Sequence, residues 1–316
     1  MAKVLILGAQ GRIGLAVTEA FHDAGWCVTA QSRRDEAVFP PDVARIRCDA
    51  LDAAGLTRAA SGADVVVNAL NAPYTEWARL AKPLAANALA AAAAGGALLM
   101  LPGNIYNFGR LLPPRLDQDT PEIPNTSKAK IRIEMEKELR DAAARGVNSV
   151  VVRSGDFFGG KGRGSWFDMV VVKSLDGNRM VYPGPTDRLH AWAYLPDLAR
   201  TFVRIAENRE KIRGFQRYHF GGHAVTGAEL HQAMERVTGR TLRLGSMPWS
   251  LVGMASPFSP MMKSIFEMRY MWRRPHALED APLRRLLGNI PHTPLEEALF
   301  STLTGLGCSV AQPGRL

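Results

Sequence analysis

Cysteine is scarce in this sequence, and the few cysteines present form no recognisable pattern. The 316 residues include three cysteines, Cys27, Cys48 and Cys308, an odd number spread over the whole chain. They have no metal-binding spacing and no disulfide framework, which is typical of a protein from a reducing compartment. We therefore expect a cytoplasmic protein. Its length suits one large domain with a smaller appended region.

A strongly hydrophobic run is also lacking. The stretch 84–101 has no charged residue, but Ala and Gly dominate it, and Asn87 and Gly95-Gly96 interrupt it. Such residues contribute little insertion energy, so we expect no transmembrane segment. A basic segment followed by an apolar one does not precede the first predicted strand, so we expect no secretory signal.

Charges of one sign do not gather in a run. The formal net charge is +9, but the arginines are spread along the chain. A dispersed basic surface is usually a solvated one, and a phosphate-rich ligand accounts for part of the excess. We expect no nucleic-acid partner.

Apolar runs alternate with helical segments through the first half. Val4-Leu5-Ile6-Leu7 is a continuous apolar run, as expected for a strand that is buried on both faces of a parallel sheet. We expect strands at 4–7, 26–30, 44–47, 64–67, 97–101 and 147–152, and helices at 13–24, 76–94 and 127–145. Repeated strand-helix units predict an α/β fold with a doubly wound parallel sheet of the Rossmann type.

The second half is less regular, with a late strand at 217–220 that returns to the sheet. We predict a Rossmann domain formed by 1–155 and 186–222. A smaller, discontinuous substrate-covering region would comprise 156–185 and 223–316.

A glycine-rich turn joins the first strand to the first helix, with the sequence Gly8-Ala9-Gln10-Gly11-Arg12-Ile13-Gly14. Gly8 suits a tight turn, Gly11 a close approach of the backbone to a pyrophosphate, and Gly14 close packing of helix on strand. The free N–H groups and the dipole at the helix N-terminus favour anions. We expect a dinucleotide to contact Gly8, Gln10, Gly11, Arg12, Ile13 and Gly14.

The G-x-x-G-x-x-G spacing resembles the short-chain dehydrogenase/reductase superfamily, in particular its extended and atypical branches (epimerase/dehydratase-like and NmrA-like proteins). The resemblance covers most of the chain and weakens after about Gly239. It implies that Asp49 lies beside the adenine and that Asn68-Ala69-Leu70 lines the cofactor. Asn87 matches a helical Asn of the extended branch.

The residues after the second strand decide which nicotinamide cofactor is preferred. An acid there would bind the ribose hydroxyls of NAD, whereas arginine accommodates the extra phosphate of NADP. This sequence has Ser32, Arg33 and Arg34, with no acid before Asp35. Guanidinium groups suit a phosphate, and Ser32 adds a hydroxyl donor. We expect NADP(H) in preference to NAD(H).

Two of the superfamily's three usual catalytic positions are changed. Active members generally use a Ser, and a Tyr and Lys spaced Tyr-x-x-x-Lys at the start of a helix. By that resemblance, Lys130 matches the Lys, but Thr126 replaces the Tyr and Pro102 the Ser. A threonine hydroxyl cannot act as a general acid near neutral pH.

Three hypotheses remain open for the chemistry. Lys130 could donate the proton, since a desolvated lysine can approach a neutral pKa. Alternatively, Tyr106 supplies a phenol while Asn104 polarises the carbonyl. In the third, the protein binds NADP(H) without turnover, as NmrA-like regulators do. Our first functional prediction is an NADP(H)-dependent oxidoreductase acting on a small apolar carbonyl or alcohol. A regulator comes second, and a nucleotide-sugar epimerase or dehydratase third, because that chemistry usually needs the missing Tyr.

A small-molecule substrate is expected at the carboxyl end of the sixth strand, where ligands of open α/β sheets bind. An apolar, aromatic-lined pocket is predicted there, with Phe108, Asp156, Phe157, Trp166 and His190 as its residues. His219 and His223 lie four apart, but Gly221-Gly222 between them argues against a helical metal pair, so no metal is predicted. The fold commonly pairs through its long helices, which leaves a homodimer open.

Overall fold

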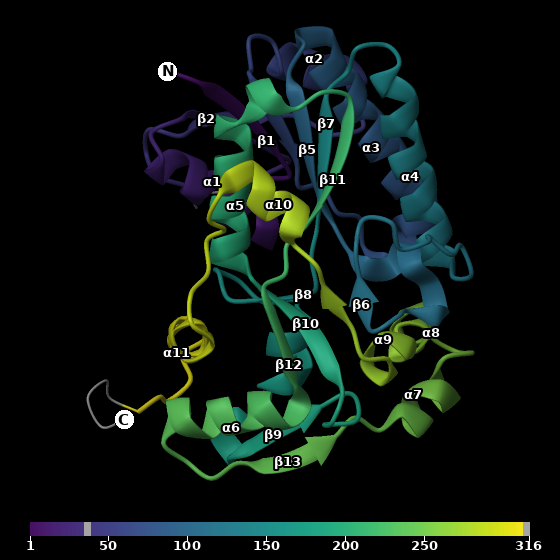
Figure 1. Cartoon of the computed structure of the whole chain (residues 1–316), viewed down its shortest axis with the longest axis vertical. Coiled ribbons are helices and arrows are strands. Elements are labelled where there is room, and N and C mark those ends of the chain that lie inside the picture. The colour runs from purple at the N-terminus through teal and green to yellow at the C-terminus, as the bar shows by residue number, and fades with distance from the viewer. Residues whose placement is uncertain (35–38, 312–316) are drawn as a thin grey trace.

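The computed structural model describes residues 1–34 and 39–311. Its larger part is built on a seven-stranded sheet in which all neighbouring strands run parallel (Figure 1). From one edge to the other, the strands are β11 (Phe215–His219), β7 (Ser149–Arg153), β5 (Leu98–Gly103), β4 (Val65–Asn68), β1 (Lys3–Leu7), β2 (Cys27–Ser32) and β3 (Ala44–Arg47). The order reverses between β1 and β4, which confirms the doubly wound Rossmann fold and places a ligand crevice at that point.

Helices cover both faces of this sheet. On one face lie α1 (Arg12–Asp23) and α5 (Leu195–Glu207), and on the other lie α2 (Ala53–Ala59), α3 (Trp77–Gly95) and α4 (Ser127–Ala143) (Figure 1). Successive side chains of a strand point to opposite faces, so Val4 and Ile6 enter one core and Leu5 and Leu7 the other. This explains why β1 reads as an uninterrupted apolar run.

The smaller part contains a three-stranded sheet and several short helices. The sheet has the order β12 (His223–Thr226), β10 (Leu189–Tyr194) and β8 (Asp156–Phe158). Two further strand pairs are β9 (Arg179–Tyr182) with β13 (Arg243–Ser246), and β6 (Arg115–Leu116) with β14 (Ala277–Leu278). The helices are α6 (Gly227–Thr238), α7 (Trp249–Ala255), α8 (Pro260–Glu267), α9 (Arg269–Arg273) and α11 (Leu295–Gly305).

Helix α10 (Ala281–Leu287) departs from the predicted division of the chain. The sequence assigns 223–316 to the substrate-covering region, but Leu283 and Leu287 pack into the core between the large sheet and α5 (Figure 1). Their spacing of four places both side chains on one helix face, which is the face that the sheet covers. Among the helices that the structure describes, none has both the length and the apolar character needed to cross a membrane.

Candidate functional site

The turn between β1 and α1 has no room for side chains at two of its glycines. Gly8 has a φ of 71°, in the left-handed region that favours glycine. A Cβ on Gly14 would lie 2.2 Å from the carbonyl oxygen of Gly8 and 2.8 Å from Ala9 Cα. Gly11, the N-cap of α1, is exposed and has no side chain to cap the helix. The backbone N–H groups of the first turn are therefore open to an anionic ligand.

A buried glutamine, which the sequence reasoning missed, fixes this turn in place. The Gln31 side chain is 1% exposed, and its Oε1 accepts a hydrogen bond from Gly8 N at 2.9 Å. Its Nε2 donates to Cys48 O at 2.5 Å, so one amide joins β2 to the turn and to the end of β3. The only signal in the sequence was a glutamine directly after the predicted strand at 26–30.

The loop after β2 presents two arginines beside the turn. Arg33 and Arg34 are exposed, and the Ser32 hydroxyl and the Gln10 amide donate to the carbonyl oxygen of Arg34, at 2.5 and 3.1 Å. These bonds tie the loop to the glycine turn. Asp35, the first acid after β2, lies outside the described residues.

Arg12 makes a contact that the sequence did not predict. Its Nη1 lies 2.8 Å from Asp168 Oδ1, and its Nη2 donates to Gly159 O at 2.8 Å. Burial raises the pKa of Asp168, but hydrogen bonds from Ser165 and Gly164 and the charge of Arg12 outweigh burial and lower it. The guanidinium therefore joins the turn to the segment after β8. Only the backbone of Arg12 remains for the predicted phosphate contact, while Ile13 packs against the core.

The segment after β4 lies directly against the turn. Ala69 O and Leu70 Cα are both 3.1 Å from the position of a Cβ on Gly8, and Asn68 Oδ1 accepts a hydrogen bond from Leu70 N at 3.2 Å. Asp49 lies after β3, exposed, with its carboxylate accepting from Leu51 N at 2.9 Å. The structure thus brings the predicted turn and the Asn68–Leu70 segment together.

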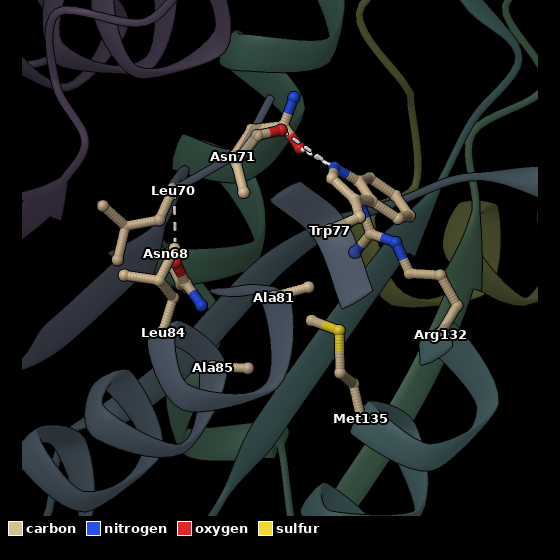
Figure 2. A pocket seen from close by; sticks show the side chains of 10 residues that line it. Asn68, Leu70, Asn71, Trp77, Ala81, Leu84, Ala85, Arg132 and Met135 are labelled. Carbon is tan, nitrogen blue, oxygen red and sulfur yellow. Dashed lines mark hydrogen bonds between the residues drawn. The ribbon is translucent and has the colours of Figure 1, made fainter. Parts of the chain in front are cut away.

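A small hollow extends from this segment between α3 and α4 (Figure 2). Its lining comprises Asn68, Leu70, Asn71, Ala72, Trp77, Ala81, Leu84, Ala85, Arg132 and Met135. Figure 2 shows the guanidinium of Arg132 beside the Trp77 indole, with its Cζ 5.1 Å from the ring centroid. The hollow is therefore mainly apolar, with one cation and two amides at its rim.

Helix α4 turns different residues toward this hollow than the sequence predicts. Lys130 is exposed, whereas Lys128 is 3% exposed and Arg132 lines the hollow. Because helix residues that are two apart are rotated by about 200°, Lys130 points away from the side that carries Lys128 and Arg132. The catalytic and cofactor-binding role of Lys130 stays a prediction, and the structure places its side chain on the exposed side of α4. The spacing of four residues between Thr126 and Lys130 is also found between Lys128 and Arg132.

The start of α4 is held by a hydroxyl and a distant carboxylate. Thr126 caps the helix, with its Oγ1 accepting from Ala129 N at 3.1 Å. Glu267, at the end of α8, accepts from Ser127 N at 3.0 Å through Oε1 and from Lys128 Nζ at 2.7 Å through Oε2. Burial raises the pKa of Glu267, but hydrogen bonds from Lys128 and Ser127 outweigh burial and lower it. Thr126 therefore has a structural role, and the buried ion pair brings α8 to the helix start.

Tyr270, on α9, places its phenol beside Thr126 at the N-terminus of α4. Its hydroxyl is buried, interacts with the side chain of Thr126 and completes no full hydrogen bond with a described residue. Burial and then the Glu267 carboxylate raise the pKa of Tyr270. The phenol is therefore protonated at neutral pH. The sequence reasoning missed this residue, because it lies far from α4 along the chain.

The family model of NAD(P)H-binding proteins matches residues 8–165, which is half of the chain. The chain belongs to this NAD(P)H-binding family. This match confirms the predicted NAD(P)H-binding domain.

Solved structures with this fold include UDP-glucose 4-epimerases. The Brucella ovis epimerase in complex with NAD has 15% identity and a TM-score of 0.76, covering 98% of this chain and 100% of its own. The Thermotoga maritima enzyme with UDP-glucose has 17% identity and a TM-score of 0.76, with coverages of 96% and 98%. At these identities the likeness establishes the fold. No curated protein matches the sequence.

In this NAD(P)H-binding protein, the buried side chain of Arg153 holds the loop after β5 in place. Asn104 Oδ1 accepts from Tyr106 N at 3.1 Å, and Arg153 Nη1 donates to Asn104 O at 2.6 Å. Tyr106 is 6% exposed, with its ring 6.0 Å from that of Trp77. Tyr106 and Asn104 are not among the lining residues of the hollow, and Tyr106 packs against Trp77, which is one of them.

The predicted substrate residues fall into two groups. Asp156 Oδ2 lies 2.9 Å from His190 Nε2, and the His190 ring stacks on Trp272 at 4.1 Å. Trp166 joins the same aromatic group, with its ring 5.4 Å from Trp272. The remaining two, Phe108 and Phe157, belong to the cores instead: Phe108 is 1% exposed and packs on Arg153 and His219, and Phe157 packs beside the large sheet. We therefore no longer assign Phe108 and Phe157 to the pocket.

Proposed function

We propose that the protein is an NADP(H)-dependent oxidoreductase that acts on a small carbonyl compound of low polarity. The observation that carries this proposal is the phenol of Tyr270 at the start of α4. A phenol is the acid that this superfamily generally uses, and here it would come from α9 instead of α4. Trp166 and Trp272 nearby favour an apolar substrate.

The residues around the turn fit a phosphorylated dinucleotide. Gly14 has no room for a Cβ, and the N-terminus of α1 has no side-chain cap. Both features suit a pyrophosphate. Arg33 and Arg34 are exposed in the loop after β2 and would contact a 2′-phosphate, and Asn68 and Leu70 line the hollow beside the turn.

Bound NADPH would supply a hydride to the carbonyl carbon of the substrate. Tyr270 would donate its proton to the carbonyl oxygen as negative charge develops there. Because burial and Glu267 raise its pKa, the phenol is held in the donating form. The same shift disfavours a phenolate base, which argues against epimerisation of the kind named for the structural relatives. Glu267, through Lys128 and Ser127, would keep α9 positioned on α4.

Replacing Arg33 and Arg34 by alanine is expected to weaken NADPH binding about 100-fold. Hydrogen bonds to charged groups contribute about 1.5–3 kcal/mol each, and about 1.4 kcal/mol corresponds to tenfold in affinity. NADH lacks the 2′-phosphate, so its dissociation constant should change little. Fluorescence titration of both cofactors measures the two constants.

Arg58→Ala is the control for this comparison, because Arg58 is an exposed arginine on α2 that pairs only loosely with Asp52, at 3.9 Å. It should leave both constants unchanged. Equal affinity of the wild-type protein for NADH and NADPH would refute the proposed preference.

Tyr270→Phe is expected to lower kcat for carbonyl reduction at least about 100-fold, the usual contribution of a positioned general acid. The NADPH dissociation constant should stay the same, because the ring and its packing remain. The measurement is NADPH oxidation with a panel of aldehydes and ketones, followed by full kinetics on the best substrate. Tyr218→Phe, a buried tyrosine on β11, is the matched control and should retain full activity.

Unchanged turnover in Tyr270→Phe would remove Tyr270 as the proton donor. A second candidate function is an NADP(H) sensor without turnover. It is favoured by the burial of the Tyr270 hydroxyl in the cluster that contains Trp77 and Met271, because a substrate would have to displace packed side chains. Tight NADPH binding without reduction of any carbonyl tested would support that function instead.

A further inference from the structure

Two histidines and an aspartate from three separate segments meet outside the candidate site described above. Asp197 lies in the first turn of α5, His223 begins β12, and His292 lies between α10 and α11. One ligand atom from each residue lies within 4.8 Å of the other two. The three side chains come from segments far apart in the sequence, so the fold alone brings them together.

His223 is a buried imidazole without a hydrogen-bond partner at one nitrogen. It is 6% exposed, and its Nε2 is buried and bonds to no described residue. Its ring lies 4.7 Å from that of His292 and 5.8 Å from that of Phe158. A buried ring nitrogen that lacks a hydrogen-bond partner can bind a metal ion through its lone pair.

Asp197 is held rigidly beside these rings. It is 1% exposed; Thr293 N donates to Oδ2 at 2.7 Å, and Thr293 Oγ1 donates to Oδ1 at 2.9 Å. Arg200 pairs with Oδ1 as well. A carboxylate has about four acceptor sites, so Oδ2 retains capacity for a further ligand. The Thr293 bonds also fix the chain next to His292, as outer-shell bonds do around metal ligands.

We propose that Asp197, His223 and His292 form a binding site for a divalent transition metal of the Zn²⁺ class. Two imidazoles and one carboxylate are a donor set that suits Zn²⁺, whereas Mg²⁺ and Ca²⁺ prefer oxygen ligands alone. Coordination through Nε2 of His223 would give that nitrogen the partner it lacks.

The three ligand atoms, which lie within 4.8 Å of one another, would have to move closer together to bind one ion. With bonds of about 2.0–2.1 Å in a tetrahedral site, ligand atoms lie about 3.3 Å apart. His292 is exposed, so it can move to close the remaining gap while the two buried ligands stay in place. A fourth position would face the neighbouring hollow, whose lining includes His292, Gly222, Asp280 and Arg284. The bound ion would join α5, β12 and the segment after α10.

Zinc binding by the full-length, chelator-treated protein tests this inference. Isothermal titration with ZnCl₂ should give one site per chain, and saturation should raise the melting temperature. His292→Ala removes an exposed ligand and should weaken the affinity at least about 100-fold, beyond the about 10–100-fold typical of losing an outer-shell partner. MgCl₂ should give no comparable heat.

His22→Ala is the matched control. His22 is a surface histidine whose Nε2 lies 2.9 Å from Asp42, so it tests whether any exposed histidine-carboxylate pair accounts for the binding. Its loss should leave zinc affinity unchanged. The proposal fails if the wild type binds no zinc, if His292→Ala binds as tightly as the wild type, or if Mg²⁺ binds equally well.

A second readout covers the case in which His292→Ala does not fold, as judged by circular dichroism. Co²⁺ added to the wild type should produce visible d–d bands more intense than those of the same concentration of aqueous Co²⁺, and excess Zn²⁺ should abolish the increase. A spectrum identical to that of aqueous Co²⁺ would overturn the proposal. NADPH binding is measured in parallel, because the metal site and the cofactor site are independent.

Discussion

Gly14→Ala is expected to abolish NADP(H) binding at ordinary concentrations, with a loss of affinity of at least about 100-fold. The added Cβ would lie 2.2 Å from Gly8 O and 2.8 Å from Ala9 Cα, and both are backbone atoms. The helix start must therefore move away from β1, and the N–H groups that face the pyrophosphate move with it. About 2.7 kcal/mol of lost binding corresponds to this 100-fold change. Fluorescence titration with NADPH measures it.

The glycines of the chain provide graded controls for this experiment. A Cβ on Gly11 would lie 3.3 Å from Gly8 O, so Gly11→Ala should weaken binding less than Gly14→Ala. A Cβ on Gly177 would meet nothing within 4 Å, and Gly177→Ala should bind NADPH normally. A folded Gly14→Ala variant with wild-type affinity would show that the turn does not hold the cofactor.

The sheet and the glycine turn were predictable because their signals are local. β1 is buried on both faces and therefore shows an apolar run. Gly14 is required by backbone contacts with Gly8 and Ala9, and Gly8 by its own left-handed φ. The return of β11 to the sheet follows from the same pattern. These features depend on the periodicity of short segments, which a single sequence displays directly.

The orientation of α4 could not be read in the same way. A spacing of four matches Thr126 with Lys130 as well as Lys128 with Arg132, and the sequence gives no direct measure of which side is buried. The packing decides: Ala129 is fully buried and Glu136 is 3% exposed, so the side opposite Lys130 faces the protein. Glutamate is rarely buried, so Glu136 gives no sign in the sequence that this face of α4 is buried.

Contacts between distant segments were also beyond the sequence. Glu267 meets Lys128, Asp168 meets Arg12, and His223 meets His292, each across a long separation. Such pairs follow from the way the smaller region folds back on the sheet, and no spacing rule connects them. From the sequence, His219 and His223 were considered as a pair and rejected, and in the structure His219 Nδ1 lies 3.1 Å from Leu116 O.

Glu136→Gln is expected to lower the free energy of unfolding by about 3–5 kcal/mol, the usual effect of removing one partner of a buried ion pair. Arg153 is 0% exposed, and its Nη2 lies 3.0 and 2.9 Å from the two oxygens of Glu136. Glutamine would present an NH₂ group to a guanidinium that has only N–H donors. Glu122, at 3.1 Å, would compensate in part. Urea unfolding should show a lower midpoint with an unchanged m-value.

Glu134→Gln is the matched control on the same helix. Glu134 pairs with Lys82 at 2.9 Å, but both side chains are about half exposed, so its loss should change stability by less than about 1 kcal/mol. Because Arg153 also donates to Asn104 O, Glu136→Gln should disturb the loop that carries Tyr106, whereas Glu134→Gln should not. Equal destabilisation by the two variants would contradict the orientation of α4, and with it the placement of Lys128 and Arg132 beside the hollow.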